Sequence, residues 1–199
     1  MSILLIAGSP SEHSRSAALL DAVSERLGLR QALIERLHIR DLSPQALLLA
    51  DVGHKSIRAA LGQVEAARAI VVATPVYKAA YSGVLKVFLD LLPQSALQGK
   101  VVLPLATGGS PHHMLALDYA LRPVLQSLAA QQILPGVYAT DAQVPKDPQG
   151  EYAVGPDIAT RLDEAVSGLL RTAFASPASA GSASAGFAPV PFAQVRCSV

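Results

Sequence analysis

The sequence predicts an α/β protein in which a parallel sheet is covered by helices on both faces. The first observation is that short, continuously apolar runs alternate with longer segments whose apolar residues recur at helical spacing. The second is that these runs lack the alternation of a half-exposed strand, as is typical of strands buried on both faces. We therefore expect about five strands in about 175 residues, arranged as a three-layer domain.

Five segments are predicted to be strands. Residues 3–7 form an apolar run that stops at Gly8, and the run over residues 69–74 stops at Pro75. A weaker pattern predicts a strand over residues 31–39. The other two strands are predicted over residues 100–106 and 133–139.

The segments between these strands are predicted to be helices. In residues 16–27, Ala17, Leu20, Val23 and Leu27 recur at helical spacing with polar positions between them. Another helix is expected to begin at Ser43-Pro44, where a capping residue precedes proline at the first helical position. The remaining helices are predicted over residues 55–67, 82–92, 112–131 and 158–174.

Composition excludes several classes of protein. The chain has 199 residues, of which 51% are hydrophobic and 16% are charged, so it is not intrinsically disordered as a whole. Its 16 basic and 15 acidic residues give a net charge of +1, which predicts binding to neither nucleic acid nor an anionic membrane. We also expect a cytoplasmic protein, because no long apolar segment or basic leader is present.

Metal and nucleophile chemistry is not expected. Cys197 is the only cysteine, so neither an internal disulfide nor a multi-cysteine metal site can form. His112 and His113 are adjacent and diverge on a helix, and the chain has no His-Glu-x-x-His pattern. Residues 1–174 are predicted to form the domain, and residues 175–199 a low-complexity tail that we expect to be disordered.

Three loops follow the predicted strands at their carboxyl ends. They cover residues 8–15, 75–81 and 107–111, and all are rich in Gly, Ser, Thr and Pro. Parallel strands place these ends at one edge of the sheet, where ligands bind in open α/β folds. We therefore expect one shared ligand site.

The first loop predicts an anion site. The hydroxyls of Ser9, Ser14 and Ser16, the guanidinium of Arg15 and the free N–H groups of a helix start would converge there. Neither a Walker loop nor a dinucleotide fingerprint is present, which favours a phosphate monoester. In the alternative interpretation, Ser14 only caps the helix and Arg15 lies in solvent.

The other two loops are suited to a planar ring. Pro75, Val76 and Tyr77 offer a flat apolar wall, although they could equally form a simple strand-to-helix turn. The segment Thr107-Gly108-Gly109-Ser110 lets the backbone approach a ligand closely, because glycine has no side chain.

Together these motifs resemble the NADPH-dependent FMN reductase family. The resemblance lies in Gly8-Ser9-Pro10 with Ser14-Arg15-Ser16, in Ala73-Thr74-Pro75-Val76-Tyr77, and in Leu105-Ala106-Thr107-Gly108-Gly109. The segments Asp118-Tyr119-Ala120-Leu121 and Pro123-Val124-Leu125 are similar to the FMN reductases of two-component alkanesulfonate monooxygenase systems. The similarity extends from about residue 3 to about residue 144.

The resemblance implies a flavodoxin-like three-layer sandwich with a five-stranded parallel sheet. It implies hydride transfer from NADPH to FMN, supply of reduced FMN to a monooxygenase of sulfur metabolism, and a homo-oligomer, either a dimer or a tetramer. Ser9, Ser14, Arg15 and Ser16 would hold the FMN phosphate. Pro75, Val76 and Tyr77 would border the isoalloxazine, and Thr107, Gly108, Gly109 and Ser110 would support its other side. No residue is assigned as catalytic, and Glu12 is expected to point away from the phosphate.

Pro123 carries a separate prediction. Inside a helix its ring clashes with the carbonyl four residues earlier, at Tyr119, so we expect a kink or a π-bulge there. The resemblance implies that Tyr119 lies in a π-helix at a subunit interface and is linked to flavin release. The alternative is a simple proline kink.

Two other function classes remain open. One is an NAD(P)H-dependent quinone or azo reductase that holds FMN tightly. The other is a non-enzymatic flavodoxin-type electron carrier, which the net charge of +1 disfavours because such carriers are usually strongly acidic.

Overall fold

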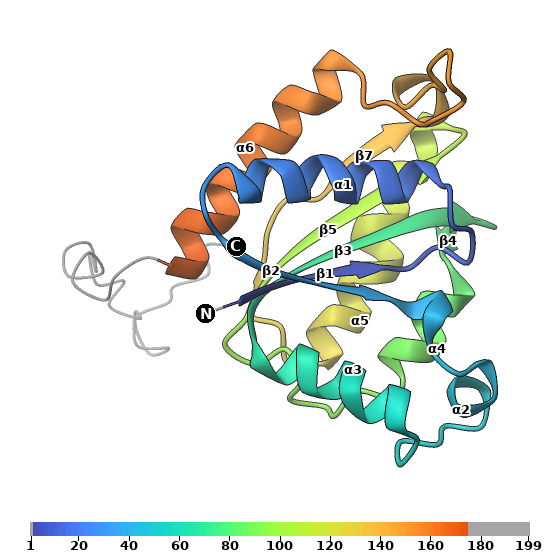
Figure 1. Cartoon of the computed structure of the whole chain (residues 1–199), viewed down its shortest axis with the longest axis vertical. Coiled ribbons are helices and arrows are strands. Elements are labelled where there is room, and N and C mark those ends of the chain that lie inside the picture. Colours follow the sequence, from blue (N-terminus) through green and yellow to red (C-terminus); the bar gives the residue numbers. More distant parts are fainter. Residues whose placement is uncertain (1, 175–199) are drawn as a thin grey trace, which may run out of the picture.

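The continuous apolar runs form the centre of one sheet. A computed structural model describes residues 2–174, and its strands β1 (Ser2–Ala7), β3 (Ala67–Tyr77) and β5 (Val101–Gly108) lie side by side (Figure 1). Every residue of β1 and β5 is buried. This burial on both faces explains why these strands read as unbroken apolar segments.

The strand order identifies the type of fold. The parallel path runs β2-β1-β3-β5-β6, with β2 at Leu33–His38 and β6 at Gln132–Ile133. Counting the parallel strands in chain order, this is the 2-1-3-4-5 arrangement of flavodoxin-like folds. The predicted fold class is therefore confirmed.

The sheet has seven strands rather than the five predicted, because of two local features. The short strand β4 (Ala80–Tyr81) pairs antiparallel with the end of β3. The fifth predicted strand is interrupted, so β6 and β7 (Val137–Thr140) pair separately with β5. Pro135 lies in the interruption and has no N–H to donate to a neighbouring strand.

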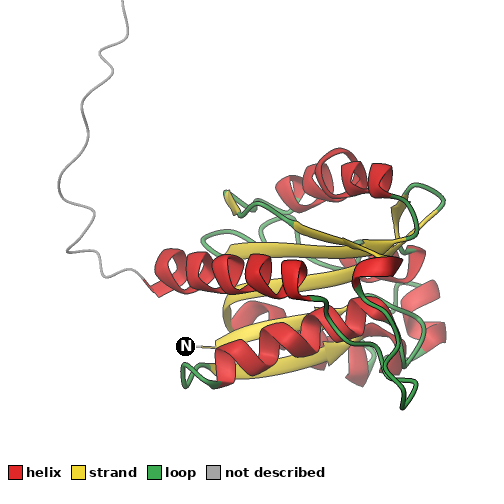
Figure 2. Ribbon diagram, turned by 90° about the horizontal axis from the view of Figure 1, so that it is seen from above, coloured by secondary structure: helices red, strands yellow, loops and turns green. Residues whose placement is uncertain are grey.

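Helices cover both faces of the sheet (Figures 1 and 2). On one face, α1 (Arg15–Gly28) and α6 (Pro156–Phe174) bury their apolar sides against Ile3 and Leu5. On the other face, Leu4 and Ile6 pack in the core that contains residues of α2 (Pro44–Leu48), α3 (Lys55–Ala66), α4 (Gly83–Leu89) and α5 (Arg122–Ser127). Successive residues of β1 thus point to opposite cores, as expected because side chains alternate between the two faces of a strand.

The segment predicted as one helix over residues 112–131 has three parts. A 3₁₀ turn (Pro111–Met114) precedes a π-helix (Ala116–Leu121), and α5 follows directly. The π-bulge predicted from Pro123 is therefore confirmed, and the alternative of a simple kink is wrong. Pro123 lies in the first turn of α5, directly after the π-helix, and has no N–H to donate to the carbonyl oxygen of Tyr119.

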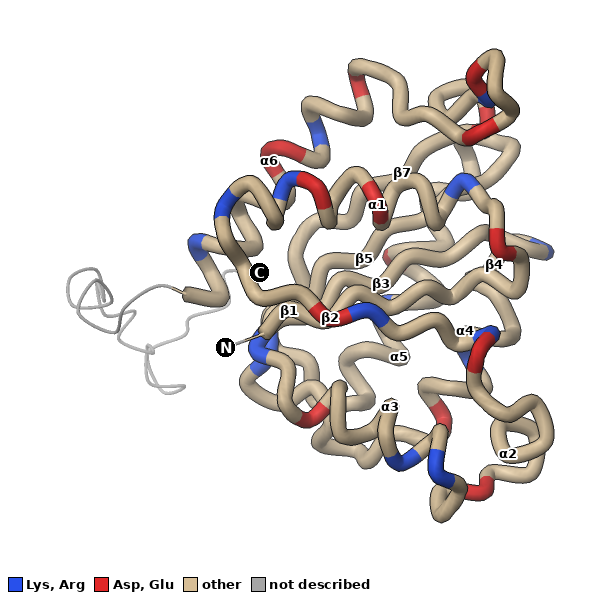
Figure 3. Tube along the Cα trace, in the orientation of Figure 1, with Lys and Arg blue, Asp and Glu red and all other residues tan. Residues whose placement is uncertain are grey.

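Charged residues lie on the helices, the loops, the edge strand β2 and the exposed start of β3 at Arg68, whereas β1 and β5 have none (Figure 3). The buried strands thus account for part of the low charge content of the chain. Among residues 2–174, no helix is long and apolar enough to cross a membrane. The predicted tail, 175–199, including Cys197, lies outside the described residues.

Candidate functional site

The first two predicted loops are joined by hydrogen bonds at the carboxyl edge of the sheet. The hydroxyl of Ser82, the capping residue of α4, donates to the carbonyl oxygen of Gly8 and accepts from Leu85 N. Its backbone N–H donates to Thr74 Oγ1 at 3.0 Å. These bonds fix the loop after β1 against the loop after β3.

The third loop is held from the neighbouring strand. Tyr138 Oη, on β7, donates to the carbonyl oxygen of Ser110 at 2.6 Å. A Cβ at Gly108 would lie only 2.7 Å from this hydroxyl, so any larger residue there would force the hydroxyl or the loop to shift. Burial raises the pKa of Tyr138, and the nearby carboxylate of Asp141 raises it further.

A pocket of about 240 Å³ lies where the three loops meet. Eight of the predicted site residues line it: Ser14, Arg15, Pro75, Val76, Tyr77, Thr107, Gly108 and Gly109. The structure thus brings together residues that are up to 95 positions apart in the sequence.

Three of the residues predicted to bind FMN do not line the pocket. Ser9 is buried, and its hydroxyl accepts a hydrogen bond from Ser11 N at 3.1 Å. Ser16 is buried with its hydroxyl 3.2 Å from that of Ser14. The hydroxyl of Ser110 accepts from His112 N at the start of the 3₁₀ turn. The hydroxyls of all three make contacts with residues close to them in the sequence.

Ser14 has both of the roles considered for it. Its hydroxyl accepts from Ala17 N at 3.1 Å, which caps α1, and the same residue lines the pocket. The N-terminal end of α1 therefore points its free N–H groups toward this pocket.

Arg15 does not lie free in solvent. Its Nε donates to the carbonyl oxygen of Val144 at 3.2 Å, and its guanidinium carbon lies 4.8 Å from the centre of the Tyr152 ring. Its Nη1 lies 3.6 Å from Asp141 Oδ2. The interpretation of Arg15 as a solvated residue is therefore wrong.

Four lining residues escaped the sequence analysis: Ser11, His13, Asp141 and Tyr152. Asp141 directly follows β7, so the rule that identified the other three loops could have pointed to it. Tyr152 reaches Arg15 from a loop far along the chain, and no sequence signal marks that contact. Glu12 is exposed and lies 3.2 Å from Arg40 Nη2, which confirms that it points away from the pocket.

Tyr119 lies on the π-helix and outside the pocket. Its side chain is 78% exposed, and the neighbouring Met114 and Leu115 are each more than half exposed. The π-helix contacts both β4 and the 3₁₀ turn. We call these three exposed residues, which lie within six positions of one another in the sequence, the π-helix patch.

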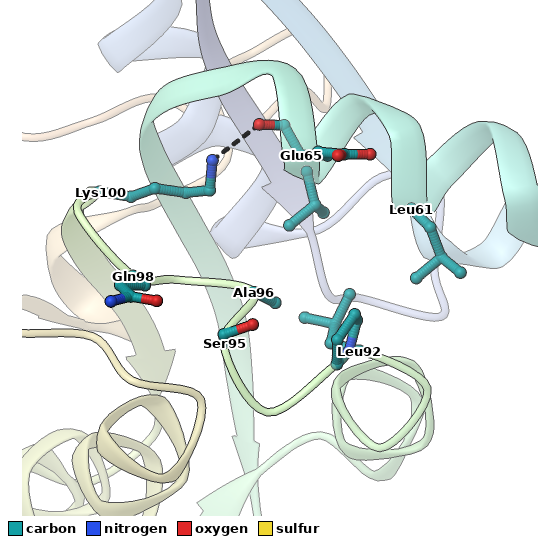
Figure 4. A pocket seen from close by; sticks show the side chains of 9 residues that line it. Leu61, Glu65, Leu92, Ser95, Ala96, Gln98 and Lys100 are labelled. Atoms are coloured by element: carbon teal, nitrogen blue, oxygen red, sulfur yellow. Dashed lines mark hydrogen bonds between the residues drawn. The ribbon is translucent and has the colours of Figure 1, made fainter.

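A larger hollow, of about 560 Å³, lies at the opposite edge of the sheet and contains none of the predicted site residues. Figure 4 shows Lys100 reaching toward the end of α3, where its Nζ donates to the carbonyl oxygens of Glu65 at 2.8 Å and Ala67 at 2.7 Å. These carbonyls have no partner within the helix, so Lys100 acts as a cap there. Burial lowers the pKa of Lys100.

Comparison with known proteins identifies the family of the chain. The model of the NADPH-dependent FMN reductase family matches residues 1–144. An FMN reductase (NADPH) from Escherichia coli strain K12 is 48% identical over 166 residues, which are 83% of this chain and 86% of that protein. The NADH-dependent FMN reductase SfnE of Pseudomonas putida is 35% identical over 148 residues, which are 72% and 79% of the two chains.

A solved structure is similar over nearly the same length. It is the apo form of an NADH:FMN oxidoreductase (EMOB), with a TM-score of 0.79 and 39% identity, covering 89% of this chain and 92% of that one. Sequence and structure agree on one conclusion: the chain belongs to the NADPH-dependent FMN reductase family, whose members are oxidoreductases that use FMN and NAD(P)H.

Proposed function

We propose that the pocket at the carboxyl ends of β1, β3 and β5 binds FMN with its phosphate at the start of α1. The observation that carries this proposal is the guanidinium of Arg15, which Val144 and Tyr152 hold at the wall of the pocket. The Ser14 hydroxyl and the positive end of α1 add donors that suit a phosphate monoester. Ser9 and Ser16 fix the loop behind these groups.

The other two loops suit the isoalloxazine ring. Pro75 and Val76 are buried and form a wall, while Tyr77 is half exposed at its edge. Gly108 and Gly109, following Thr107, present backbone to the opposite side, where a larger residue at Gly108 would collide with Tyr138. Ser110 positions this segment through its carbonyl bond to Tyr138.

In this arrangement the residues bind and orient, and the cofactors supply the chemistry. When bound, FMN would supply the hydride-accepting chemistry and reduced NAD(P)H the hydride. The chain would hold the phosphate and one face of the ring, which would leave the other face for the nicotinamide. We assign no residue as a proton donor or acceptor.

We further propose that NADPH is the preferred donor and that reduced FMN leaves the protein to supply a monooxygenase that acts on alkanesulfonates. The support is the resemblance in Asp118–Leu121 and Pro123, together with the π-helix that the structure places there. The π-helix patch would form the contact of a homo-oligomer, a dimer or a tetramer, because an exposed tyrosine beside exposed Met114 and Leu115 is typical of a protein interface.

The phosphate position can be tested with Arg15→Gln. We expect its Kd for FMN to rise by about tenfold or more, because a charged donor to the phosphate is lost. Riboflavin lacks the phosphate, so its binding should change little. Arg26→Gln is a matched control, since Arg26 lies on the same helix but pairs with Asp163 at 2.7 Å. Equal losses for FMN and riboflavin, or no loss for either, would contradict the proposed orientation.

The supply of reduced flavin needs a coupled assay. The protein is mixed with NADPH, FMN and an alkanesulfonate monooxygenase in air, and consumption of the alkanesulfonate is followed. We expect consumption only when all components are present. If NADPH is oxidised but no alkanesulfonate is consumed, the monooxygenase assignment is wrong while the reductase activity stands.

A further inference from the structure

We infer that Asp141 keeps FMN exchangeable by competing with the flavin phosphate for Arg15. This inference rests on the proposed function, because it concerns the same pocket. Asp141 would limit the affinity of the pocket for FMN, which must leave after it is reduced.

The carboxylate of Asp141 lies between the two parts of the proposed FMN site. Its Oδ2 is 3.6 Å from Arg15 Nη1 on the phosphate side. The same oxygen is 3.8 Å from where a Cβ would stand at Gly109, on the ring side. Asp141 is the one acidic residue among those that line the pocket, so a bound phosphate meets its negative charge directly.

Arg15 does not depend on Asp141 for its position. The Nε bond to the Val144 carbonyl and the Tyr152 ring hold the guanidinium from other sides. The distance of 3.6 Å to Asp141 is longer than a hydrogen bond, so this contact is mainly Coulombic. Loss of the carboxylate should therefore free a donor without releasing the side chain.

Neighbouring acidic residues do not share this role. Glu12 pairs with Arg40 at 3.2 Å, and Glu151 lies 3.7 Å from His13, and neither lines the pocket. Glu12 is thus a matched control for Asp141. It lies in the loop between β1 and Arg15 and carries the same charge, but it faces away from the pocket.

The size of the effect follows from partial exposure. The Asp141 side chain is 48% exposed, so water and salt screen its repulsion of the phosphate. We expect a change in Kd of about three- to tenfold at low ionic strength, and less in high salt.

The test compares FMN and riboflavin binding to wild type, Asp141→Asn, Asp141→Ala and Glu12→Gln by flavin fluorescence, at low and at high salt. The expected result is tighter FMN binding and slower FMN dissociation in both Asp141 variants, little change for riboflavin, and no change in Glu12→Gln. The gain should shrink in high salt.

Three results would overturn the inference: FMN binding that is unchanged or weaker in Asp141→Asn, an equal gain for riboflavin, or an equal gain in Glu12→Gln. Failure of the proposed function would give a different result. The wild-type protein would then bind neither FMN nor riboflavin, and it would not oxidise NADPH when FMN is added.

Discussion

The backbone N–H of Arg122 donates a hydrogen bond to the carbonyl oxygen of Leu117, five residues earlier. This is the π-helical pattern, and it ends immediately before Pro123, which has no N–H to offer Tyr119. Tyr119 is exposed on this wider turn, and the π-helix packs beside β4, which follows the second loop.

Replacement of Tyr119 by alanine tests the role of the π-helix patch. We expect Tyr119→Ala to reduce the oligomer mass in gel filtration, because an exposed aromatic side chain at an interface contributes a large apolar area. We also expect slower FMN exchange and lower turnover with free FMN. Leu48→Ala is the matched control, since Leu48 is 79% exposed but lies on α2. If Tyr119→Ala keeps the same oligomer mass, flavin affinity and turnover, Tyr119 has no role in assembly or flavin release.

Replacement of Gly108 by alanine tests the close approach of the third loop. The added Cβ would lie 2.7 Å from Tyr138 Oη, so we expect a loss of about 1–3 kcal/mol in stability and weaker FMN binding. Urea unfolding and FMN titration measure the two effects. Adding Tyr138→Phe removes the hydroxyl and should restore part of the stability. Gly109→Ala is the control for stability, because its nearest atom is 3.8 Å away.

Replacement of Ser82 tests the bond between the first two loops. Ser82→Ala loses both the cap of α4 and the hydrogen bond to Gly8, so we expect about 2–3 kcal/mol of destabilisation in urea. Ser43→Ala is the control, because the Ser43 hydroxyl caps α2 by accepting from Ala46 N and makes no bond to another loop. We therefore expect a loss of about 1 kcal/mol. Equal losses in the two variants would show that the bond to Gly8 adds nothing.

The pH dependence of unfolding tests the bond between Tyr138 and Ser110. Burial raises the pKa of Tyr138 above its ordinary value of 10.0, so the folded state favours the protonated hydroxyl. The contribution of the protonated Tyr138 hydroxyl to the free energy of unfolding is fully present below pH 10.0. It is lost as the pH rises through the pKa of Tyr138 in the folded state. The stability difference between wild type and Tyr138→Phe should therefore be constant below about pH 10 and shrink above it. A difference that does not change up to pH 11 or so would contradict this account.

Two kinds of element could be predicted from the sequence: strands that are buried on both faces, and a helix whose shape depends on a residue within it. The strands β1, β3 and β5 are visible because both of their faces are buried. Strand β2 gives a weaker pattern because it lies at the edge, where Leu33 is 64% exposed. The π-helix could be predicted because a proline at position 123 acts on its own helix.

The site could be predicted only in part, for a physical reason. Loops at strand ends are visible from the order of strands, which brought Arg15, Val76 and Gly108 together. The contacts of Arg15 with Asp141 and Tyr152 depend on how the segment after β7 folds back, which no local pattern encodes. Ser9 and Ser16 have the residue type of phosphate ligands, and both are buried, which their sequence context does not indicate.

Dependence of NADPH oxidation on added FMN tests the central claim most directly. Protein freed of flavin by gel filtration is mixed with NADPH in air, with and without FMN, and absorbance of NADPH is followed. If FMN is an exchangeable substrate, oxidation requires added FMN and its rate saturates with FMN concentration. Oxidation at full rate without added FMN, by protein that retains its flavin colour, would contradict the claim.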